Sequence, residues 1–197
     1  MATALADWWQ QLDLKNADLL GWSLGGQMAL QLAADRLVQP RRLVLVATTP
    51  KFCSDKSWSA GLPQAQVRAL LRNLGRAYEK TLGDFFRLQF DGEQLSRERY
   101  RQIIRFAVRA GRLPEPADAI ETLRLLGAAD QRSLLEKISQ PTLVTHGELD
   151  RIIPLASGEY LADQLDQAKL QCLAEVGHAP FFSRPAESVA AWRKFLQ

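Results

Sequence analysis

Short apolar runs alternate with amphipathic stretches along this chain, and the two patterns predict different elements. Four apolar runs have the length of strands, and they lie at residues 17–21, 42–47, 141–146 and 170–176. Residues 1–13 repeat apolar side chains at helical spacing, namely Leu5, Trp8, Trp9 and Leu12. Further helices are predicted at 157–165 and from about Pro185, where Val189, Trp192 and Phe195 would face the core. Because a helix joins the last two strands, the sequence predicts a βαβ unit and a mostly parallel sheet.

The middle of the chain has no strand pattern. Between about residues 51 and 130 the pattern is helical, with breaks at 61–63, at Gly92 and at 111–116. We therefore expect an α/β fold in which residues 51–130 form a helical lid, inserted after the strand at 42–47. Residues 1–50 and 131–197 would form the core beneath it.

Residues 21–26 read Gly-Trp-Ser-Leu-Gly-Gly and match the G-x-S-x-G pattern of a nucleophile elbow, with Ser23 at its tip. A strand-like run precedes them and a helix-forming run follows, which is the order that an elbow requires. Gly21 and Gly25 supply the small residues expected two positions on either side of the serine. The N–H of Leu24, at the start of the helix, would face an oxyanion forming beside Ser23. The alternative is a glycine-rich turn with an incidental serine.

A serine nucleophile needs a base, and the chain contains two histidines. His178 lies in a loop just after the apolar run at 170–176, and Asp150 follows the apolar run at 141–146. In α/β-hydrolases the nucleophilic serine comes first along the chain, then the acid and then the histidine base, and Ser23, Asp150 and His178 follow this order. All three are expected at the carboxyl ends of parallel strands, where open α/β sheets bind their ligands.

Three other side chains compete for these roles. His146 lies at the end of a predicted strand, and we expect it to be packed and bonded to backbone rather than catalytic. Glu148 and Asp163 are alternative acids, but Glu148 is expected in a loop and Asp163 on the solvated face of a helix.

A run of arginines marks the predicted lid. Six arginines and one acid, Glu98, lie between residues 97 and 112. Four of the arginines recur every four residues and would form a stripe along one helix: Arg97, Arg101, Arg105 and Arg109. The stripe is either an ordinary solvated face or a surface that docks an acidic partner. Nucleic acid fits less well, because exposed aromatic side chains are few.

Composition narrows the class of protein. Hydrophobic residues make up 47% of the 197, which is normal for a globular chain, and no apolar run approaches the length of a membrane span. The N-terminus lacks a basic signal-peptide region, and Cys53 and Cys172 do not suggest a disulfide framework. We expect a cytoplasmic protein without a membrane partner. No metal-ligand spacing, phosphate loop or dinucleotide motif is present, so no metal or cofactor is expected.

Several motifs together resemble the pimeloyl-[acyl-carrier protein] methyl ester esterases of biotin synthesis, a family of the α/β-hydrolase superfamily. They are residues 21–26, Leu149-Asp150 with 152–154, 177–181 with 185–187, and the lid segment 85–89 with Arg97 and Arg101. The resemblance covers nearly the whole chain. It implies an α/β-hydrolase fold, of which only the C-terminal strands are present, and hydrolysis of a methyl or short-alkyl ester.

The resemblance also implies roles for individual residues. Ser23, Asp150 and His178 correspond to the catalytic triad, and Trp22 and Leu24 to residues around the oxyanion and substrate. The acyl-chain channel would be lined by the lid residues Phe85, Phe86, Arg87, Leu88 and Gln89. An acidic acyl-carrier protein, carrying the substrate, would dock on basic lid residues: Lys80, Arg97, Arg101 and Arg105. One further basic position of the family corresponds to Asp84, where the charge is reversed.

Members of the family carry an additional N-terminal part, with strands and a His-Gly-Trp-Gly-like loop that supplies a second oxyanion N–H. The resemblance implies that this part is missing here, and loss of one such donor costs about 10²–10³ in rate. Leu19 and Leu20 would then lie on an unpaired apolar edge, prone to aggregation or dimer formation. The alternatives left open are a truncated, poorly active fragment and another α/β-hydrolase such as a thioesterase, lipase-like enzyme or C–C hydrolase.

Overall fold

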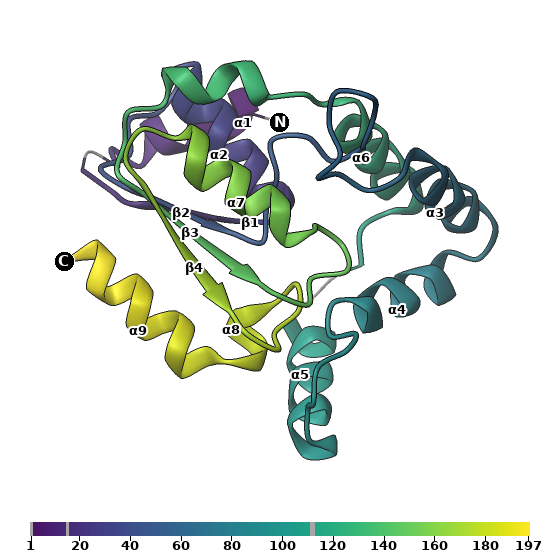
Figure 1. Cartoon of the computed structure of the whole chain (residues 1–197). Coiled ribbons are helices and arrows are strands. Elements are labelled where there is room, and N and C mark those ends of the chain that lie inside the picture. The colour runs from purple at the N-terminus through teal and green to yellow at the C-terminus, as the bar shows by residue number, and fades with distance from the viewer. Residues whose placement is uncertain (1, 15, 111–112) are drawn as a thin grey trace.

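A computed structural model describes residues 2–14, 16–110 and 113–197, with a four-stranded parallel sheet at its centre (Figure 1). Its strands are β1 (Leu19–Trp22), β2 (Leu43–Val46), β3 (Thr142–Gly147) and β4 (Ala168–Leu173), in the order β1-β2-β3-β4. The register places Trp22 beside Val46 and Val46 beside Thr145. Because all four strands are parallel, their carboxyl ends lie side by side at the same end of the sheet, as the sequence predicts.

Helices cover both faces of this sheet. Helices α2 (Leu24–Ala34) and α7 (Leu155–Gln164) lie on one face with the 3₁₀ helix η1 (Arg132–Lys137), while α9 (Pro185–Leu196) lies on the other (Figure 1). The side chains of β2 alternate accordingly. Leu43 and Leu45 belong to the core under α2 and α7, whereas Val44 and Val46 pack against Trp192 and Phe195 of α9. Full burial of each such side chain stabilises the fold by about 1.5–3 kcal/mol.

Strand β1 forms one edge of the sheet among the described residues, and Leu20 on it is 45% exposed. The expected apolar edge is therefore present. Helix α1 (Ala2–Gln11) packs through Ala6 and Trp9 on Leu32 and Val38, which leaves the predicted apolar residues Leu5, Trp8 and Leu12 exposed. Pairing of this edge with a second copy stays a prediction.

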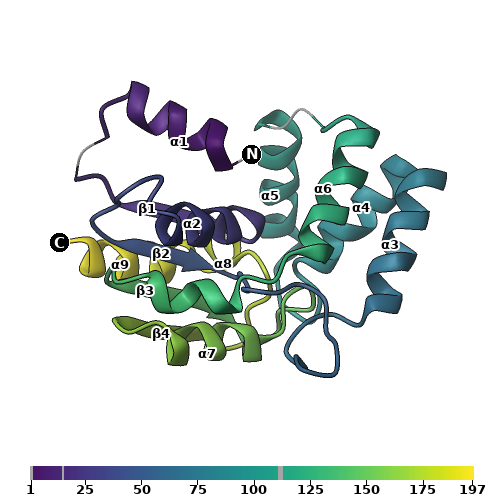
Figure 2. The same cartoon turned by 90° about the horizontal axis from the view of Figure 1, so that it is seen from above.

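Four helices follow β2 and gather beside the sheet rather than on its faces (Figure 2). They are α3 (Gln64–Arg76), α4 (Tyr78–Leu88), α5 (Arg97–Ala110) and α6 (Pro116–Ala128). Val67 and Leu74 of α3 and Leu123 of α6 share an apolar cluster with Ile152, which follows β3. This cluster joins the helical segment to the part of the chain that carries Asp150.

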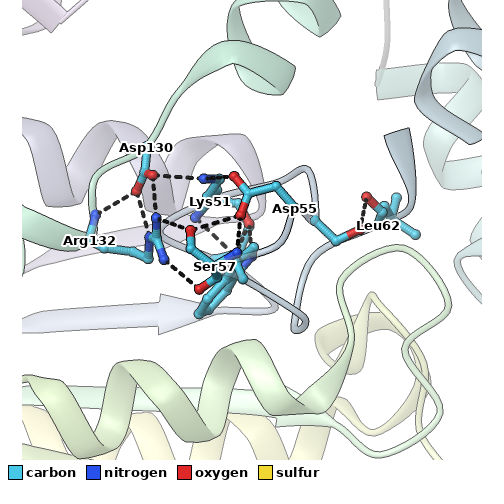
Figure 3. Close-up of polar contacts among 9 residues, drawn as sticks. Lys51, Asp55, Ser57, Leu62, Asp130 and Arg132 are labelled. Atoms are coloured by element: carbon cyan, nitrogen blue, oxygen red, sulfur yellow. Dashed lines mark hydrogen bonds and ion pairs between the residues drawn. The ribbon is translucent and has the colours of Figure 1, made fainter. Parts of the chain in front are cut away.

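A set of ion pairs closes the base of this helical segment (Figure 3). Lys51, just after β2, lies 2.9 Å from Asp130, just after α6, and 2.5 Å from Asp55. Arg132 pairs with the same Asp130 at 2.7 Å and lies over the ring of Trp58. Hydrogen bonds from Lys51 and Ser57 lower the pKa of Asp55 to about 2. The two ends of the inserted segment are thus tied to each other by charge.

Some elements differ from the sequence predictions. Strand β4 ends at Leu173 rather than at residue 176, because the chain turns at Glu175, whose φ is 58°. The short helices η1 and α8 (Pro180–Ser183) have too few turns to give a periodic signal. Val189 is 37% exposed and does not face the core as expected, although Trp192 and Phe195 do. Among the described residues, no helix has the length and apolar character needed to cross a membrane.

Candidate active site

Ser23 occupies a strained turn between β1 and α2, with φ 54° and ψ −118°. Such a conformation of a non-glycine residue costs about 1–3 kcal/mol and persists only when its surroundings hold it. Here the N–H of Ser23 donates to the carbonyl of Val46 at 2.9 Å, and the hydroxyl of Thr48 donates to the carbonyl of Ser23 at 2.7 Å. Strand β2 and the residues after it therefore fix the serine.

The steric need for glycine falls on Gly21 and Gly26. A Cβ on Gly21 would lie 2.4 Å from the carbonyl oxygen of Gly25, and a Cβ on Gly26 would lie 2.5 Å from the Thr48 side chain. A Cβ on Gly25 meets nothing within 4 Å beyond its own helix. The expectation that Gly25 supplies a required small residue is wrong, because the turn leaves no room for a Cβ at Gly21 and Gly26 but leaves room for one at Gly25.

Ser23, His178 and Asp150 form one chain of hydrogen bonds. Nε2 of His178 lies 3.0 Å from Oγ of Ser23, and Nδ1 lies 2.7 Å from Oδ2 of Asp150. A carboxylate only accepts hydrogen bonds, so Nδ1 carries the imidazole proton and Nε2 is free to accept one from the serine. His178 is 1% exposed, which shields the pair from bulk water.

Asp150 is fixed from several sides. The backbone N–H groups of Ile152 and Ile153 each donate to its Oδ1 at 2.8 Å. Burial raises the pKa of this carboxyl, but hydrogen bonds from His146 and His178 and their charges outweigh it and hold the pKa at about 2. Asp150 is therefore ionised near neutral pH and able to orient His178.

Among the described residues, none of the competing groups bonds to the hydroxyl of Ser23. Nε2 of His146 lies 2.8 Å from the carbonyl oxygen of Ile153, so it carries the proton and donates, in the packed, backbone-bonded arrangement that was expected. Its Nδ1 has no partner among the described residues and faces Gly158. Glu148 accepts from the N–H of Glu175, and Asp163 lies on exposed helix surface.

Trp22, predicted near the oxyanion, is engaged with His178. Its indole N–H donates to the carbonyl of His178 at 2.9 Å, and its ring lies 5.5 Å from the imidazole. The indole N–H is therefore occupied by the histidine loop. The N–H of Leu24 opens α2 and has no acceptor in the described part of the chain, so it can meet an oxyanion at Ser23.

Two neighbouring apolar cavities share part of their lining, and one of them is lined by Ser23. The first, of about 300 Å³, is lined by Ser23 and by lid residues that include Leu74, Leu82 and Phe85. The second, of about 480 Å³, adds a charged set made of Arg76, Lys80, Asp84 and Arg151. Both cavities share the side chains Phe52, Leu70, Phe85 and Ile152.

The predicted channel residues occupy several different places. Phe85 lines both cavities, and Leu88 lines the larger one. Phe86 packs against Phe90, with ring centroids 5.5 Å apart. Arg87 is exposed, is paired with Asp84 and lines neither cavity. Gln89 is 7% exposed, and its backbone carbonyl accepts a hydrogen bond from the backbone N–H of His178 at 2.9 Å.

The basic lid residues divide into two groups. On α4, Lys80 lies 2.6 Å from Asp84, which also pairs with Arg87, and these hydrogen bonds lower the pKa of Asp84. On α5, three exposed arginines have no ion pair within the described residues: Arg97, Arg101 and Arg105. Arg112 and the Arg109 side chain lie outside what the structure describes. Of the predicted docking residues, those without an ion pair in the described chain therefore all lie on α5.

Two contacts of the lid were not predicted from the sequence. Arg99, which lies off the four-residue stripe, donates twice to the carbonyl of Phe182, at 3.1 and 2.6 Å. Glu93 accepts the N–H of Gly177 through Oε1 at 2.7 Å. The sequence carries no signal for either contact.

Comparison with known proteins agrees with the fold described above. The family model described as "Alpha/beta hydrolase family" matches residues 2–192. A pimeloyl-[acyl-carrier protein] methyl ester esterase from Nitrosomonas europaea is 36% identical over 172 residues, covering 87% of this chain and 68% of that protein. The protein of the same name from Chromobacterium violaceum is 34% identical, over 92% of this chain and 70% of its own length.

Solved structures share the fold at lower identity. An esterase from Exiguobacterium antarcticum superposes with a TM-score of 0.89 at 23% identity, covering 100% of this chain and 72% of that one. A bromoperoxidase from Bacillus anthracis gives 0.87 at 21% identity, over 99% of this chain and 72% of its own. The chain belongs to the alpha/beta hydrolase family, and within it to the group of the pimeloyl-[acyl-carrier protein] methyl ester esterases.

Proposed function

We propose that this chain is a serine carboxylesterase that removes the methyl group from a methyl-esterified acyl chain carried by an acyl-carrier protein, as the names of its relatives state for them. The observation that carries the proposal is the hydrogen-bonded chain from Ser23 through His178 to Asp150 beside an apolar cavity. Residues 51–130 act as the lid over this site, and residues 1–50 and 131–197 as its core.

The reaction follows from the positions of the protons. His178 Nε2 takes the Ser23 proton while Oγ attacks the ester carbonyl carbon, and the resulting oxyanion lies against the N–H of Leu24. The imidazolium then protonates the departing methoxide, which leaves as methanol, and an acyl-enzyme remains. Water attacks this ester with His178 again as base, and the acid is released. Asp150 stays ionised and stabilises the imidazolium in both steps.

The cavities support an acyl substrate. The space beside Ser23 is lined mainly by Leu, Phe and Ile side chains, so a methylene chain would bury its apolar surface there. The neighbouring space shares four of those side chains and would accept the linker to the carrier. Trp22 contributes by fixing His178 rather than by contacting the oxyanion.

The carrier would dock mainly on α5. Carrier proteins of this kind are acidic, and Arg97, Arg101 and Arg105 present positive charge without internal partners in the described chain. Lys80 contributes less in this account, because Asp84 already neutralises it. The reversed charge at Asp84 therefore moves docking from α4 towards α5.

Substrate comparison tests the proposal. Methyl pimeloyl-carrier protein should be hydrolysed with a kcat/KM well above that for a free methyl ester of the same acid. A preference for acyl thioesters, or cleavage of a carbon–carbon bond, would assign the site to a different hydrolase. Absence of turnover on every ester, with Ser23 unreactive in folded protein, would refute the esterase function itself.

A further inference from the structure

We propose that Glu93, in the connection between α4 and α5, is a positioning residue. It fixes the position of the catalytic base relative to Ser23 by holding the backbone just before His178. The proposal rests on the esterase function above and deepens it. It means that the lid does more than cover the substrate, since it also fixes the group that activates the serine.

Two consecutive amides of the histidine loop are bonded to one short lid segment. The N–H of Gly177 donates to Oε1 of Glu93 at 2.7 Å, and the N–H of His178 donates to the carbonyl of Gln89 at 2.9 Å. The approach is close, because a Cβ on Gly177 would lie 2.4 Å from the Gln89 oxygen and 2.8 Å from Oε1 of Glu93. The loop has no room to shift towards the lid.

The carboxylate of Glu93 is partly buried, so water reaches it only in part. Burial raises its pKa, while hydrogen bonds from Ser183 and Gly177 and the charge of Arg184 oppose that rise. A half-buried carboxylate is unfavourable unless hydrogen bonds satisfy it. The N–H of Gly177, directly before the histidine, supplies such a bond at 2.7 Å, so Glu93 joins the lid segment to the histidine loop.

The remaining contacts of His178 hold its ring and its carbonyl, whereas the lid segment holds its amide and the amide before it. Asp150 fixes the rotation of the imidazole at Nδ1, and Trp22 holds the carbonyl of His178. The 3.0 Å distance from Nε2 to Oγ of Ser23 depends also on where the backbone lies. A misplacement of about 1 Å at such a site can cost about 10²-fold in rate.

Three variants of Glu93 separate this role from a general effect on the lid. Glu93→Ala removes the acceptor, Glu93→Gln keeps a carbonyl oxygen at the same reach, and Glu93→Asp withdraws it by one methylene. Glu98→Ala is the matched control, since Glu98 is an exposed carboxylate of the lid with no hydrogen bond or ion pair in the described chain. A free p-nitrophenyl ester is the substrate, because it avoids carrier docking.

Glu93→Ala is expected to lower kcat about tenfold or more with KM within about twofold, and Glu93→Asp to lower it less. Glu93→Gln and Glu98→Ala should stay within about twofold of the parent protein. A raised KM at unchanged kcat, or a folded Glu93→Gln as impaired as Glu93→Ala, would overturn the proposal. So would full activity in Glu93→Ala.

A second readout does not need turnover. The Nδ1 proton of His178, bonded to Asp150, should give a downfield proton NMR resonance that moves in Glu93→Ala or Glu93→Asp and stays in Glu93→Gln. An unchanged resonance in all three refutes the positioning role. If the parent protein hydrolyses no ester, the proposed function fails while this resonance still decides the role of Glu93. If Glu93→Ala does not fold, Glu93→Asp and Glu93→Gln carry the comparison.

Discussion

The imidazole of His146 lies beside the carboxylate of Asp150, with Nε2 of the histidine 3.4 Å from Oδ2 of the aspartate. The same oxygen lies 2.7 Å from Nδ1 of His178, so two histidines share one carboxylate. Only His178 reaches Ser23, while His146 donates to the carbonyl of Ile153. One histidine is thus placed to move a proton and the other to hold the loop that carries the acid.

Replacing His146 should therefore mainly lower stability, whereas replacing His178 should mainly lower kcat. His146→Phe leaves the carbonyl of Ile153 unpaired in the interior and should lower the free energy of unfolding by about 1–3 kcal/mol, with a loss in kcat of no more than about tenfold. His178→Ala should lower kcat by at least about 10³-fold with a smaller change in stability. Urea unfolding and steady-state kinetics measure both effects. Equal losses of kcat in the two variants would contradict this division.

The elbow gives a paired test of its glycines. Gly26→Ala forces a Cβ to within 2.5 Å of Thr48, whose hydroxyl holds the carbonyl of Ser23, so stability should fall by about 1–3 kcal/mol and activity with it. Gly25→Ala meets open space and should be neutral or stabilising by up to about 1 kcal/mol, since alanine favours a helix. Thermal unfolding of both variants decides the matter, and a greater loss at Gly25 would contradict the geometry.

The ion pairs at the base of the lid should stabilise the fold in a pH-dependent way. Asp55 has a pKa of about 2, and the pKa of Asp130 is lowered by hydrogen bonds from Arg132 and Lys51. Depressed carboxyl pKa values contribute stability that is present above the unfolded value, near 4, and lost as the pH falls through the folded value. Lys51→Met should therefore lower the urea midpoint at pH 7, by a difference that narrows from about pH 4 towards pH 2.

Lys80→Met is the control for that experiment. Lys80 also pairs with an aspartate, but its side chain is 76% exposed whereas that of Lys51 is 13% exposed. Exposed pairs contribute little, so the midpoint of Lys80→Met should barely change. Equal effects of the two substitutions would show that the charges at the lid base have no special role.

Carrier docking is tested by charge reversal on α5. Arg97→Glu with Arg101→Glu should raise KM for a carrier-linked ester about tenfold or more and leave a free p-nitrophenyl ester unchanged, with the difference shrinking at high salt. Asp84→Asn should have the opposite effect and lower KM, because it releases Lys80 and Arg87. An unchanged KM for the carrier-linked ester after reversal of both arginines would refute docking on α5.

Local patterns were sufficient for much of this site. The strand–glycine–serine–helix order identified the elbow, and the position of His178 after the last strand identified the histidine that reaches Ser23. Hydropathy records which face of an element is buried, so it also located the sheet and the helical insertion. It carries no information on which distant groups meet. The contacts of Glu93 with Gly177 and of Arg99 with Phe182 arise from the placement of the lid against residues 177–182. The indole of Trp22 is occupied because the end of β1 lies beside the histidine loop.

The distinction between Gly25 and Gly26 illustrates the same limit. Both glycines follow the serine, and the motif favours Gly25, yet the crowding comes from Thr48, which lies just beyond β2. Only the register of β1 against β2 brings Thr48 to the elbow. A one-dimensional pattern cannot contain such a contact.

Reaction with a fluorophosphonate tests whether Ser23 is an activated nucleophile. Such a reagent modifies a serine whose hydroxyl is activated by a neighbouring base, and peptide mapping identifies the serine. We predict one label per chain on Ser23, slowed strongly by His178→Ala and abolished by Ser23→Ala. A folded protein that stays unlabelled, or a label on another serine that persists in Ser23→Ala, would contradict the account.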